Sequence, residues 1–253
     1  MTATGRRLEE VGLNAMQTQR QLFYDGWLLR VSPGKAKRAR SVNAFFGSTL
    51  PLAAKIAHCV ATYDRLGLPP LFRMTPFDQP AALDAALAER GFVAFGETLV
   101  QALAMERPPE VPGAADEVTV AAPDAQAFVA AVGELRGSPA LQREAHRELL
   151  ANAPQPRRHV VVYVGTRPVC TATTALEDGY AGLFDVVTAP DARGRGYATL
   201  ACATLLNWAW GRGAARAYLQ VEADNAAALS IYRRLGFGTA YAYRYRGRPG
   251  ALG

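Results

Sequence analysis

A short glycine-rich turn, Arg193-Gly194-Arg195-Gly196, is the segment best suited to chemistry. Glycines let backbone N–H groups approach a ligand closely, because no Cβ stands in the way. A helix beginning at this turn adds unpaired N–H groups and the positive end of its dipole. Such a turn alone is often only a tight turn. Here it lies between a predicted strand and a predicted helix and carries two arginines, which favours a pyrophosphate site. Neither GxGxxG nor GxxxxGK[ST] occurs, so dinucleotide and P-loop sites are disfavoured.

Two ordered blocks then indicate a family. The stretch Val187–Ala198, VTAPDARGRGYA, resembles the acyl-CoA loop of the GNAT superfamily of N-acetyltransferases, which reads Arg/Gln-x-x-Gly-x-Gly/Ala. The stretch Leu219–Phe237, LQVEADNAAALSIYRRLGF, is similar to the family's next block, a strand ending in Val followed by Asn, Ala, Tyr and Gly-Phe. The resemblance covers roughly residues 117–245. It implies acetyl-CoA as co-substrate and involves no metal.

The resemblance also implies which residues bind the cofactor. The strand end from Val186 to Thr188 would pair its backbone with the pantetheine arm, which requires this strand to splay from its neighbour near Val187. The turn would wrap the pyrophosphate, and Asn225 would reach towards the cofactor arm besides capping the following helix. The implied cofactor-binding residues are Val186, Val187, Thr188, Arg193, Gly194, Arg195, Gly196, Tyr197, Ala198 and Asn225.

Two kinds of residue are candidates for proton transfer. Tyr232 would, by the resemblance, protonate the departing CoA thiolate; the alternative is a core aromatic residue on an amphipathic helix. The strand glutamate that some members use as general base is absent, because Gly182 occupies its position. The remaining candidates are Asp185 on the same strand and Glu222 on the neighbouring one, where it shares a face with Gln220. Each carboxylate has the alternative of a solvated or salt-bridged strand residue, and a water relay remains open.

Hydrophobic patterning predicts the elements that position these residues. Together with this pattern, the resemblance implies the fold class α/β (α+β), with a mixed, mostly antiparallel GNAT sheet flanked by helices and a second, partial GNAT-like half. The second part of the chain should form, in order, a strand, two helices, a hairpin, a third strand, then helix, strand, helix and strand. The expected ranges are 117–122, 125–135, 139–152, 159–176, 179–188, 197–212, 217–223, 225–237 and 240–246.

The first part of the chain echoes the second. Residues 71–92 parallel residues 217–237, and the segments GWLLRVS and SVNAFF resemble the strands at VCTATTAL and GLFDVVT. The repeat suggests duplication, although convergent α/β patterning is the alternative. Pro80 stands at the position of Asn225, Leu87 at that of Tyr232, and Gly47–Pro51 replaces the arginine turn. We therefore predict a degenerate, non-catalytic GNAT-like half at 1–105, a Pro-rich linker at 106–116 and a catalytic GNAT domain at 117–253.

Composition limits the other possibilities. The 253 residues carry 28 basic and 22 acidic side chains, a net charge of +6, and half of them are hydrophobic. No apolar run approaches the roughly 18 residues of a membrane span, and no secretion signal is visible. The cysteines Cys59, Cys170 and Cys202 are odd in number and widely spaced, which favours buried, reduced thiols and a cytoplasmic location. The nearest approach to a basic patch is the alternating series Arg244, Arg246 and Arg248, too sparse to predict nucleic-acid binding.

The sequence thus predicts an acetyl-CoA-dependent N-acetyltransferase whose acceptor amine attacks the thioester directly. The acceptor is expected to be a small-molecule amine or amino acid. The alternatives are an acetyltransferase acting on protein amines and a non-enzymatic acyl-CoA-binding sensor. We expect no nucleic-acid or membrane partner, and a homo-oligomer is possible. The first half is expected to form one wall of the acceptor cleft without binding CoA productively.

Overall fold

The computed structural model describes residues 3–18, 20–34, 36–113 and 117–250. The helices are α1 (Ala3–Asn14), α2 (Leu52–Arg65), α3 (Leu83–Glu89), α4 (Ala125–Arg136), α5 (Ala140–Ala151), α6 (Tyr197–Trp210) and α7 (Ala226–Arg234), with 3₁₀ turns η1 (Lys37–Arg40) and η2 (Pro190–Ala192). The strands are β1 (Arg20–Tyr24), β2 (Trp27–Val31), β3 (Val42–Asn43), β4 (Leu71–Met74), β5 (Val93–Ala104), β6 (Val118–Ala121), β7 (Arg157–Val164), β8 (Arg167–Glu177), β9 (Tyr180–Thr188), β10 (Arg216–Glu222) and β11 (Gly238–Gly247).

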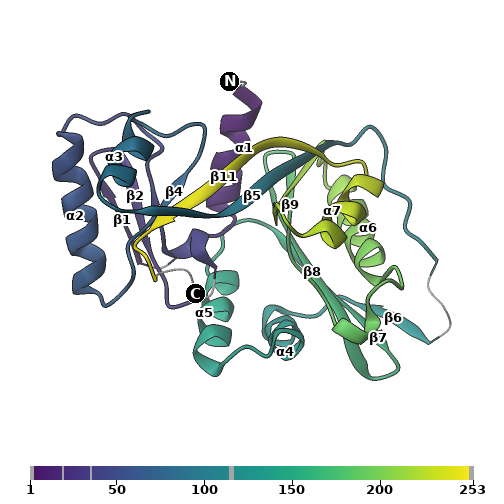
Figure 1. The fold of residues 1–253 in the computed structure, drawn as a ribbon. Coiled ribbons are helices and arrows are strands. Elements are labelled where there is room, and N and C mark those ends of the chain that lie inside the picture. The colour runs from purple at the N-terminus through teal and green to yellow at the C-terminus, as the bar shows by residue number, and fades with distance from the viewer. Residues whose placement is uncertain (1–2, 19, 35, 114–116, 251–253) are drawn as a thin grey trace.

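All of these strands belong to one 11-stranded sheet, in the order β1-β2-β3-β4-β11-β5-β10-β9-β8-β7-β6. The pairs β3–β4 and β9–β10 are parallel and the others are antiparallel. The C-terminal strand β11 lies between β4 and β5 of the first half, while β5 lies between β10 and β11 (Figure 1). The two halves therefore exchange strands at the centre of the sheet. The predicted fold class, a mixed and mostly antiparallel sheet flanked by helices, is confirmed.

Local signals fix the ends of the helices in the second half. The Asp124 side chain accepts a hydrogen bond from the Ala127 N–H at 2.8 Å and caps α4. Asn225 likewise caps α7, accepting from the Ala228 N–H at 3.1 Å, as predicted. Gly236, with φ of 91°, follows the last turn of α7 in a conformation that favours glycine. Each segment expected between residues 117 and 246 forms the predicted kind of element, with ends displaced by a few residues.

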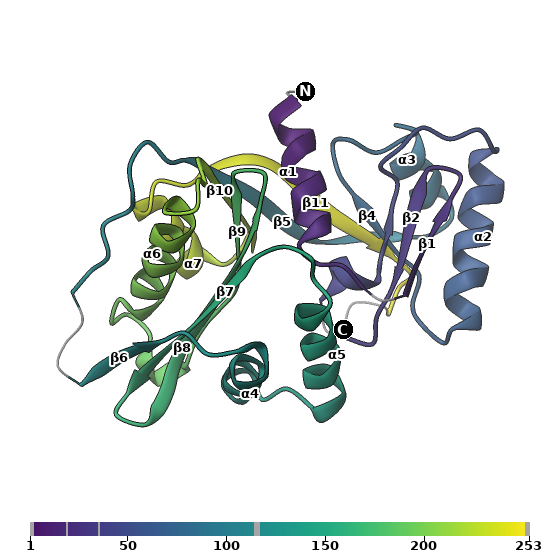
Figure 2. The ribbon, with the colours of Figure 1, turned by 180° about the vertical axis from the view of Figure 1, so that it is seen from behind.

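The sheet separates two layers of helices in the second half. Val160 and Val162 on β7 pack into the core with α6, whereas Val161 packs with Phe128 of α4. Because successive strand residues point to opposite faces, α6 and α4 must lie on opposite sides of the sheet. Figure 2 shows α4 and α5 on the face away from α6. The N-terminal helix α1 lies on the second half's sheet as well, since the Tyr218 hydroxyl on β10 donates to the Val11 carbonyl at 3.0 Å.

The first half repeats the element order of the second. The series β2, β3, α2, β4, α3, β5 has the same order and kinds of element as β8, β9, α6, β10, α7, β11. The origin of this likeness by duplication stays a prediction. Residues 106–113 of the expected linker form no helix or strand. The sheet is nevertheless continuous across the two halves, because β5, before this segment, pairs with β10 and β11, after it.

One expectation from composition is met by the described residues. Cys59, Cys170 and Cys202 are buried, as predicted. Within the described ranges, no helix is both long and apolar enough to cross a membrane.

The exchange of β5 and β11 generates a prediction about a cut chain. A protease site inserted after Glu110, in the segment without helix or strand, should allow cleavage without separating the halves. Because β5 is hydrogen-bonded to β10 and β11, the two fragments should co-elute in size-exclusion chromatography and separate only in denaturant. Residues 117–253 expressed alone should not fold, because β10 and β11 lose the strand that joins them. Two native fragments eluting apart would contradict the exchange.

Candidate active site

The first feature of the site is the separation of β9 from β10. The parallel ladder joins Tyr180 to Arg216 and ends at the pair Leu183–Leu219. Beyond that pair β9 continues to Thr188 against β8 alone, and β10 continues to Glu222 against β5 alone. The edge of β9 that includes Val186, Val187 and Thr188 therefore faces a gap in the sheet. The predicted splay is confirmed, and it begins four residues before Val187.

The arginine turn lies at the end of this gap. Residues 193–196 are exposed, and α6 begins at Tyr197 with no side chain capping its first turn. Gly194 and Gly196 have φ of 76° and 83°, and a Cβ built at either would meet no protein atom within 4 Å. Arg193 and Arg195 form no ion pair within the described ranges, whereas Arg167 pairs with Asp191 at 2.6 Å. Free N–H groups, open space and unpaired guanidinium groups fit a bound pyrophosphate.

Asp185 occupies a bulge in β9. Two residues, Asp185 and Val186, stand between the pairs Thr173–Phe184 and Thr171–Val187, and φ of Asp185 is 51°. This left-handed conformation is strained for a residue other than glycine, and such strain is concentrated at functional sites. The bulge turns the Asp185 carboxylate towards the helices α4 and α5.

A histidine and an arginine hold that carboxylate. One Asp185 oxygen lies 2.8 Å from His146 Nε2, and the other lies 3.0 Å from Arg136 Nη1. Burial acts to raise the pKa of Asp185, but His146 and Arg136 together lower it well below its usual range. Asp185 is therefore ionised and held at neutral pH. Sequence reasoning did not find His146 or Arg136, because 39 residues separate His146 from its partner.

Glu222 is exposed at the end of β10 and lines a cavity of about 670 Å³. Gln220 lines the same cavity, as expected for two residues on one strand face, and accepts a hydrogen bond from the Tyr243 hydroxyl at 2.9 Å. Gly182 offers no alternative position for a carboxylate. A Cβ there would lie 2.6 Å from atoms of both Phe184 and Tyr218, so the fold excludes any side chain at this residue.

Tyr232 lies in the middle of α7, on its buried face. Its side chain is 7% exposed and packs edge-on against Phe237 with ring centroids 6.0 Å apart. Burial raises the pKa of its hydroxyl well above the usual range for tyrosine. The group therefore remains protonated at neutral pH, which suits a proton donor and not a base. The same packing also fits the alternative of a core aromatic residue.

Both halves of the chain supply walls to the cavity at Glu222. The second half contributes the last residue of α4, Arg136, the loop 137–139, Gln142 of α5 and the end of β10. The first half contributes η1 with the preceding loop, together with Gly96 and Thr98 of β5. The exchanged strand β11 adds Tyr243 and Tyr245. Sequence reasoning did not identify the η1 residues as part of a site, because they have no motif and reach it only through the fold.

The helix start in the first half that corresponds to the arginine turn is filled by the protein's own carboxylate. Asp25 accepts hydrogen bonds from the N–H groups of Thr49 and Leu50, each at 2.9 Å. The buried Lys55 ammonium lies 3.1 Å from the same carboxylate, and these hydrogen bonds hold the pKa of Asp25 well below its usual range. An anion already occupies the place before α2 where a phosphate would bind.

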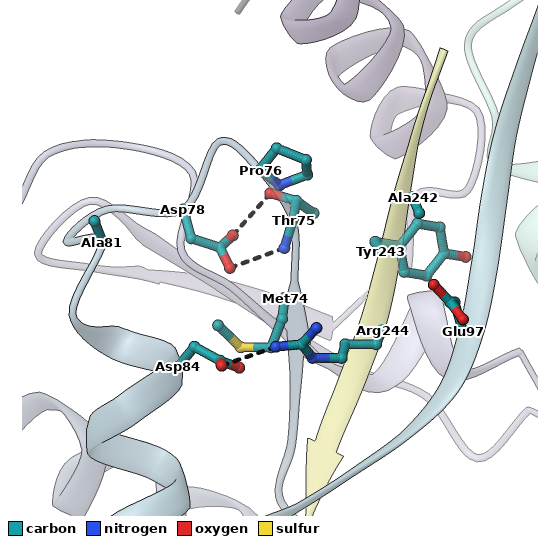
Figure 3. Close-up of a pocket in the computed structure, with 10 residues that line it drawn as sticks. All are labelled: Met74, Thr75, Pro76, Asp78, Ala81, Asp84, Glu97, Ala242, Tyr243 and Arg244. Carbon is teal, nitrogen blue, oxygen red and sulfur yellow. Dashed lines mark hydrogen bonds and ion pairs between the residues drawn. The ribbon is translucent and has the colours of Figure 1, made fainter. Parts of the chain in front are cut away.

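A second cavity, of about 370 Å³, lies in the first half between the end of β4, the start of α3 and β11 (Figure 3). Asp78 accepts hydrogen bonds there from the N–H and hydroxyl of Thr75, at 2.9 and 2.8 Å. Burial raises the pKa of Asp78 to about 7, although these hydrogen bonds oppose the shift. Arg244 on β11 lies on the opposite side and pairs with Asp84 at 2.8 Å.

The other arginines of the alternating C-terminal series are also paired. Arg246 contacts Asp84 at 2.7 Å, and Arg248 contacts Asp64 at 2.7 Å. These residues fasten the end of the chain to the first half and do not form an open basic patch.

Comparison with known proteins agrees with this geometry. Residues 2–246 match the family described as "Probable histone acetyltransferase Rv0428c C-terminal". The chain is similar to the uncharacterized N-acetyltransferase YobR of Bacillus subtilis, with 26% identity over 95% of this chain and 97% of that protein. It is also similar to the structure of a GCN5-related N-acetyltransferase from Kribbella flavida, with a TM-score of 0.71, 19% identity, and coverage of 98% of this chain and 96% of that one. A tandem GNAT protein from the clavulanic acid biosynthesis pathway shows a TM-score of 0.63 and 15% identity, over 77% of this chain and 68% of that one.

A sheet that opens beside an uncapped, glycine-flanked helix start is the fold of a GNAT acyltransferase. The chain belongs to the Rv0428c C-terminal family of acetyltransferases, within the GNAT superfamily. The family match extends across both halves, so the first half is part of the family's fold. The predicted superfamily and the acyltransferase activity are confirmed.

The shifted pKa of Asp78 generates a prediction about stability and pH. The pKa of Asp78 is about 7 in the folded protein and near 3.9 in the unfolded chain. As pH rises between these two values, the unfolded chain loses the proton first, so the free energy of unfolding falls until pH passes about 7. Asp78→Asn preserves the hydrogen-bonding shape without the charge. We expect the variant to be more stable than wild type at pH 8, by on the order of 1 kcal/mol, with little difference at pH 4.5. Thermal unfolding at both values measures this, and a Tm difference independent of pH would contradict it.

Proposed function

We propose that the protein transfers an acetyl group from acetyl-CoA to the primary amine of a small molecule or amino acid. The observation that carries the proposal is the gap between β9 and β10, with the arginine turn at one end and Glu222 beside a large cavity. An extended cofactor arm and an amine can meet in such a gap from opposite faces of the sheet. When bound, acetyl-CoA supplies the activated acetyl thioester.

The donor side is assigned to residues that fit the cofactor. The backbone of Val186, Val187 and Thr188 lies on the open edge of β9 and is available for pairing with an amide-containing arm. The turn from Arg193 to Ala198 would hold the pyrophosphate through N–H groups and guanidinium groups. Asn225 is committed to capping α7 through its side-chain oxygen, which leaves its amide nitrogen for the cofactor arm.

Glu222 is the better candidate for accepting the proton of the acceptor ammonium. It lies at the cavity wall and has no ion-pair partner within the described ranges. Asp185 is already bound to two cationic or proton-bearing groups, and its lowered pKa reduces its affinity for a further proton. We assign Asp185 the role of holding Arg136, which lines the cavity, together with His146, and Glu222 the role of general base.

Tyr232 is proposed as the residue that holds a proton for the leaving group at its hydroxyl oxygen. Its raised pKa keeps that proton in place at neutral pH, and no described residue competes for it through a hydrogen bond. The first half is proposed to close the cleft and exclude water without binding a second cofactor. The internal Asp25 carboxylate at the start of α2 supports one acetyl-CoA per chain.

The arginine turn generates a prediction about binding. Arg193→Ala should weaken acetyl-CoA binding roughly 10-fold or more, because a charge-assisted phosphate contact is lost. Gly196→Val should weaken it further, since φ of 83° is unfavourable for a β-branched residue and the side chain would enter the open cradle. Calorimetry measures both affinities and the stoichiometry.

The matched control for this binding test is Arg212→Ala. Arg212 is an exposed arginine just beyond the opposite end of α6, and it stacks on Trp208 at 4.3 Å. Its loss should leave acetyl-CoA affinity unchanged. Wild-type affinity in the Arg193 and Gly196 variants, or two equivalents of acetyl-CoA per chain, would contradict the assignment.

The proton-transfer residues generate a prediction about turnover. Tyr232→Phe and Glu222→Gln should each fold, bind acetyl-CoA with unchanged affinity, and lower kcat about 10²- to 10⁴-fold. The reason is that each keeps its shape and loses only the group that exchanges a proton. Release of CoA, measured with a panel of amines, gives kcat and its pH profile.

Asp185→Asn serves as the contrast in the turnover test. If Glu222 is the base, the Glu222 variant loses the acid limb of the pH profile, whereas the Asp185 variant keeps it. A wild-type kcat in either proton-transfer variant, with chemistry rate-limiting, removes that residue from the proposal. Absence of acetyl transfer to every amine would refute the function itself.

A further inference from the structure

The cavity beside Glu222 has an excess of positive charge. Its described lining includes four cationic side chains, Lys37, Arg38, Arg40 and Arg136, and a single carboxylate, Glu222. Arg136 is neutralised by Asp185 at 3.0 Å. The other three come from η1 of the first half and form no ion pair with any described residue. Each is half-buried, so water screens these charges less than it would on an open surface.

Two of these three cations lie near aromatic rings on the strands that border the cavity. The Lys37 ammonium lies 5.4 Å from the ring centroid of Phe95 on β5. The Arg38 guanidinium lies 5.8 Å from the ring centroid of Phe184, the residue before the Asp185 bulge on β9. The Arg38 side chain therefore extends from η1 towards β9 of the second half, and that of Lys37 extends along β5, while Arg40 lines the same cavity.

Part of this positive charge is buried without a hydrogen-bond partner among the described residues. Arg38 Nη1 is buried and has no hydrogen-bond partner within the described residues. Burial also lowers the pKa of Arg40 from its usual range. On β2, the buried Arg30 has its pKa lowered to about 10 by burial and by the neighbouring Arg73. Burying charges without partners is costly, so an anion entering the cavity would relieve an existing penalty.

We propose that the acceptor carries an anionic group, a carboxylate or phosphate, which Lys37, Arg38 and Arg40 bind while Glu222 receives its ammonium. This inference rests on the proposed function and narrows its acceptor to amines that are also anions. The degenerate first half then supplies specificity through η1. A basic protein tail is disfavoured, because its positive charges would be placed against three unpaired cations.

Matched pairs of acceptors test the charge requirement. We expect wild type to acetylate at least one amino acid, or phosphoethanolamine, with kcat/KM about 10- to 100-fold above that of its uncharged partner, the amino-acid amide or ethanolamine. The amino acids and phosphoethanolamine separate a carboxylate requirement from a phosphate requirement. Spermidine and a lysine-containing basic peptide should be poor acceptors. A preference for these polycations, or equal rates within every pair, overturns the inference.

Single variants of η1 test which residues are responsible. Lys37→Gln, Arg38→Gln and Arg40→Gln should each raise KM for the anionic acceptor about 10-fold and leave that for the uncharged partner unchanged. Arg65→Gln, which removes the same charge from an exposed position on α2, should change neither. Acetyl-CoA affinity should be unaffected throughout. Its loss in the η1 variants would assign these cations to the donor and overturn the proposal.

A binding measurement separates this inference from the proposed function. Calorimetry with CoA saturating the donor site requires no turnover. It compares the binding of the charged compounds N-acetylglutamate, N-acetylglycine and N-acetylphosphoethanolamine with that of the uncharged compounds N-acetylglycinamide and N-acetylethanolamine. One outcome supports the cation site even if no acceptor is acetylated: a charged compound binds more tightly than the uncharged compounds, and the η1 variants weaken its binding. Equal binding of charged and uncharged compounds overturns it even if the enzyme is active.

Discussion

The pairing of β5 and β11 at the centre of the sheet is the constraint on which the rest of the structure depends. Each of these strands belongs by sequence to one half and is hydrogen-bonded on both sides to strands of the other half. The neighbours of β5 are β10 and β11, and those of β11 are β4 and β5. Neither half can complete its sheet alone, so their relative position is fixed by a continuous ladder and not by surface packing. A site built from both halves therefore has walls as rigid as those within a single domain.

That rigidity decides how the cavity can work. Glu222 lies at the end of β10, directly beside β5, while η1 is held against the other side of the same opening by the first half. The bulge at Asp185 and the end of the β9–β10 ladder at Leu183 open the sheet where these parts meet. The helix α6 lies on one face of the sheet at this opening, and the helices α4 and α5 lie on the other (Figures 1 and 2).

The two halves have the same order of strands and helices but use the start of the corresponding helix differently. In the second half, the helix after the gap, α6, is preceded by exposed glycines and by two arginines that form no ion pair with any residue the structure describes. In the first half, the helix in the same place is α2, which begins at Leu52. The N–H groups of Thr49 and Leu50 just before it donate to the Asp25 carboxylate, which also pairs with Lys55. An internal carboxylate in place of an external phosphate stabilises the first half and frees its other surfaces. One of these surfaces, η1, lines the cavity beside Glu222.

The sequence by itself determined what depends on neighbouring residues. The arginine turn, the cap at Asn225, the stop at Gly236 and the order of strands and helices in the second half follow from local hydrogen bonding, backbone freedom and periodicity, which act over a few residues. Tertiary structure alone decided the exchange of β5 with β11, the contact of His146 with Asp185, and the entry of Lys37, Arg38 and Arg40 into the cavity. These contacts join residues far apart in the chain, and no local pattern records them. The contacts between the halves follow from the shared ladder at the centre of the sheet, which brings the two halves together around one opening. His146 reaches Asp185 because α5 packs against the second half's own sheet.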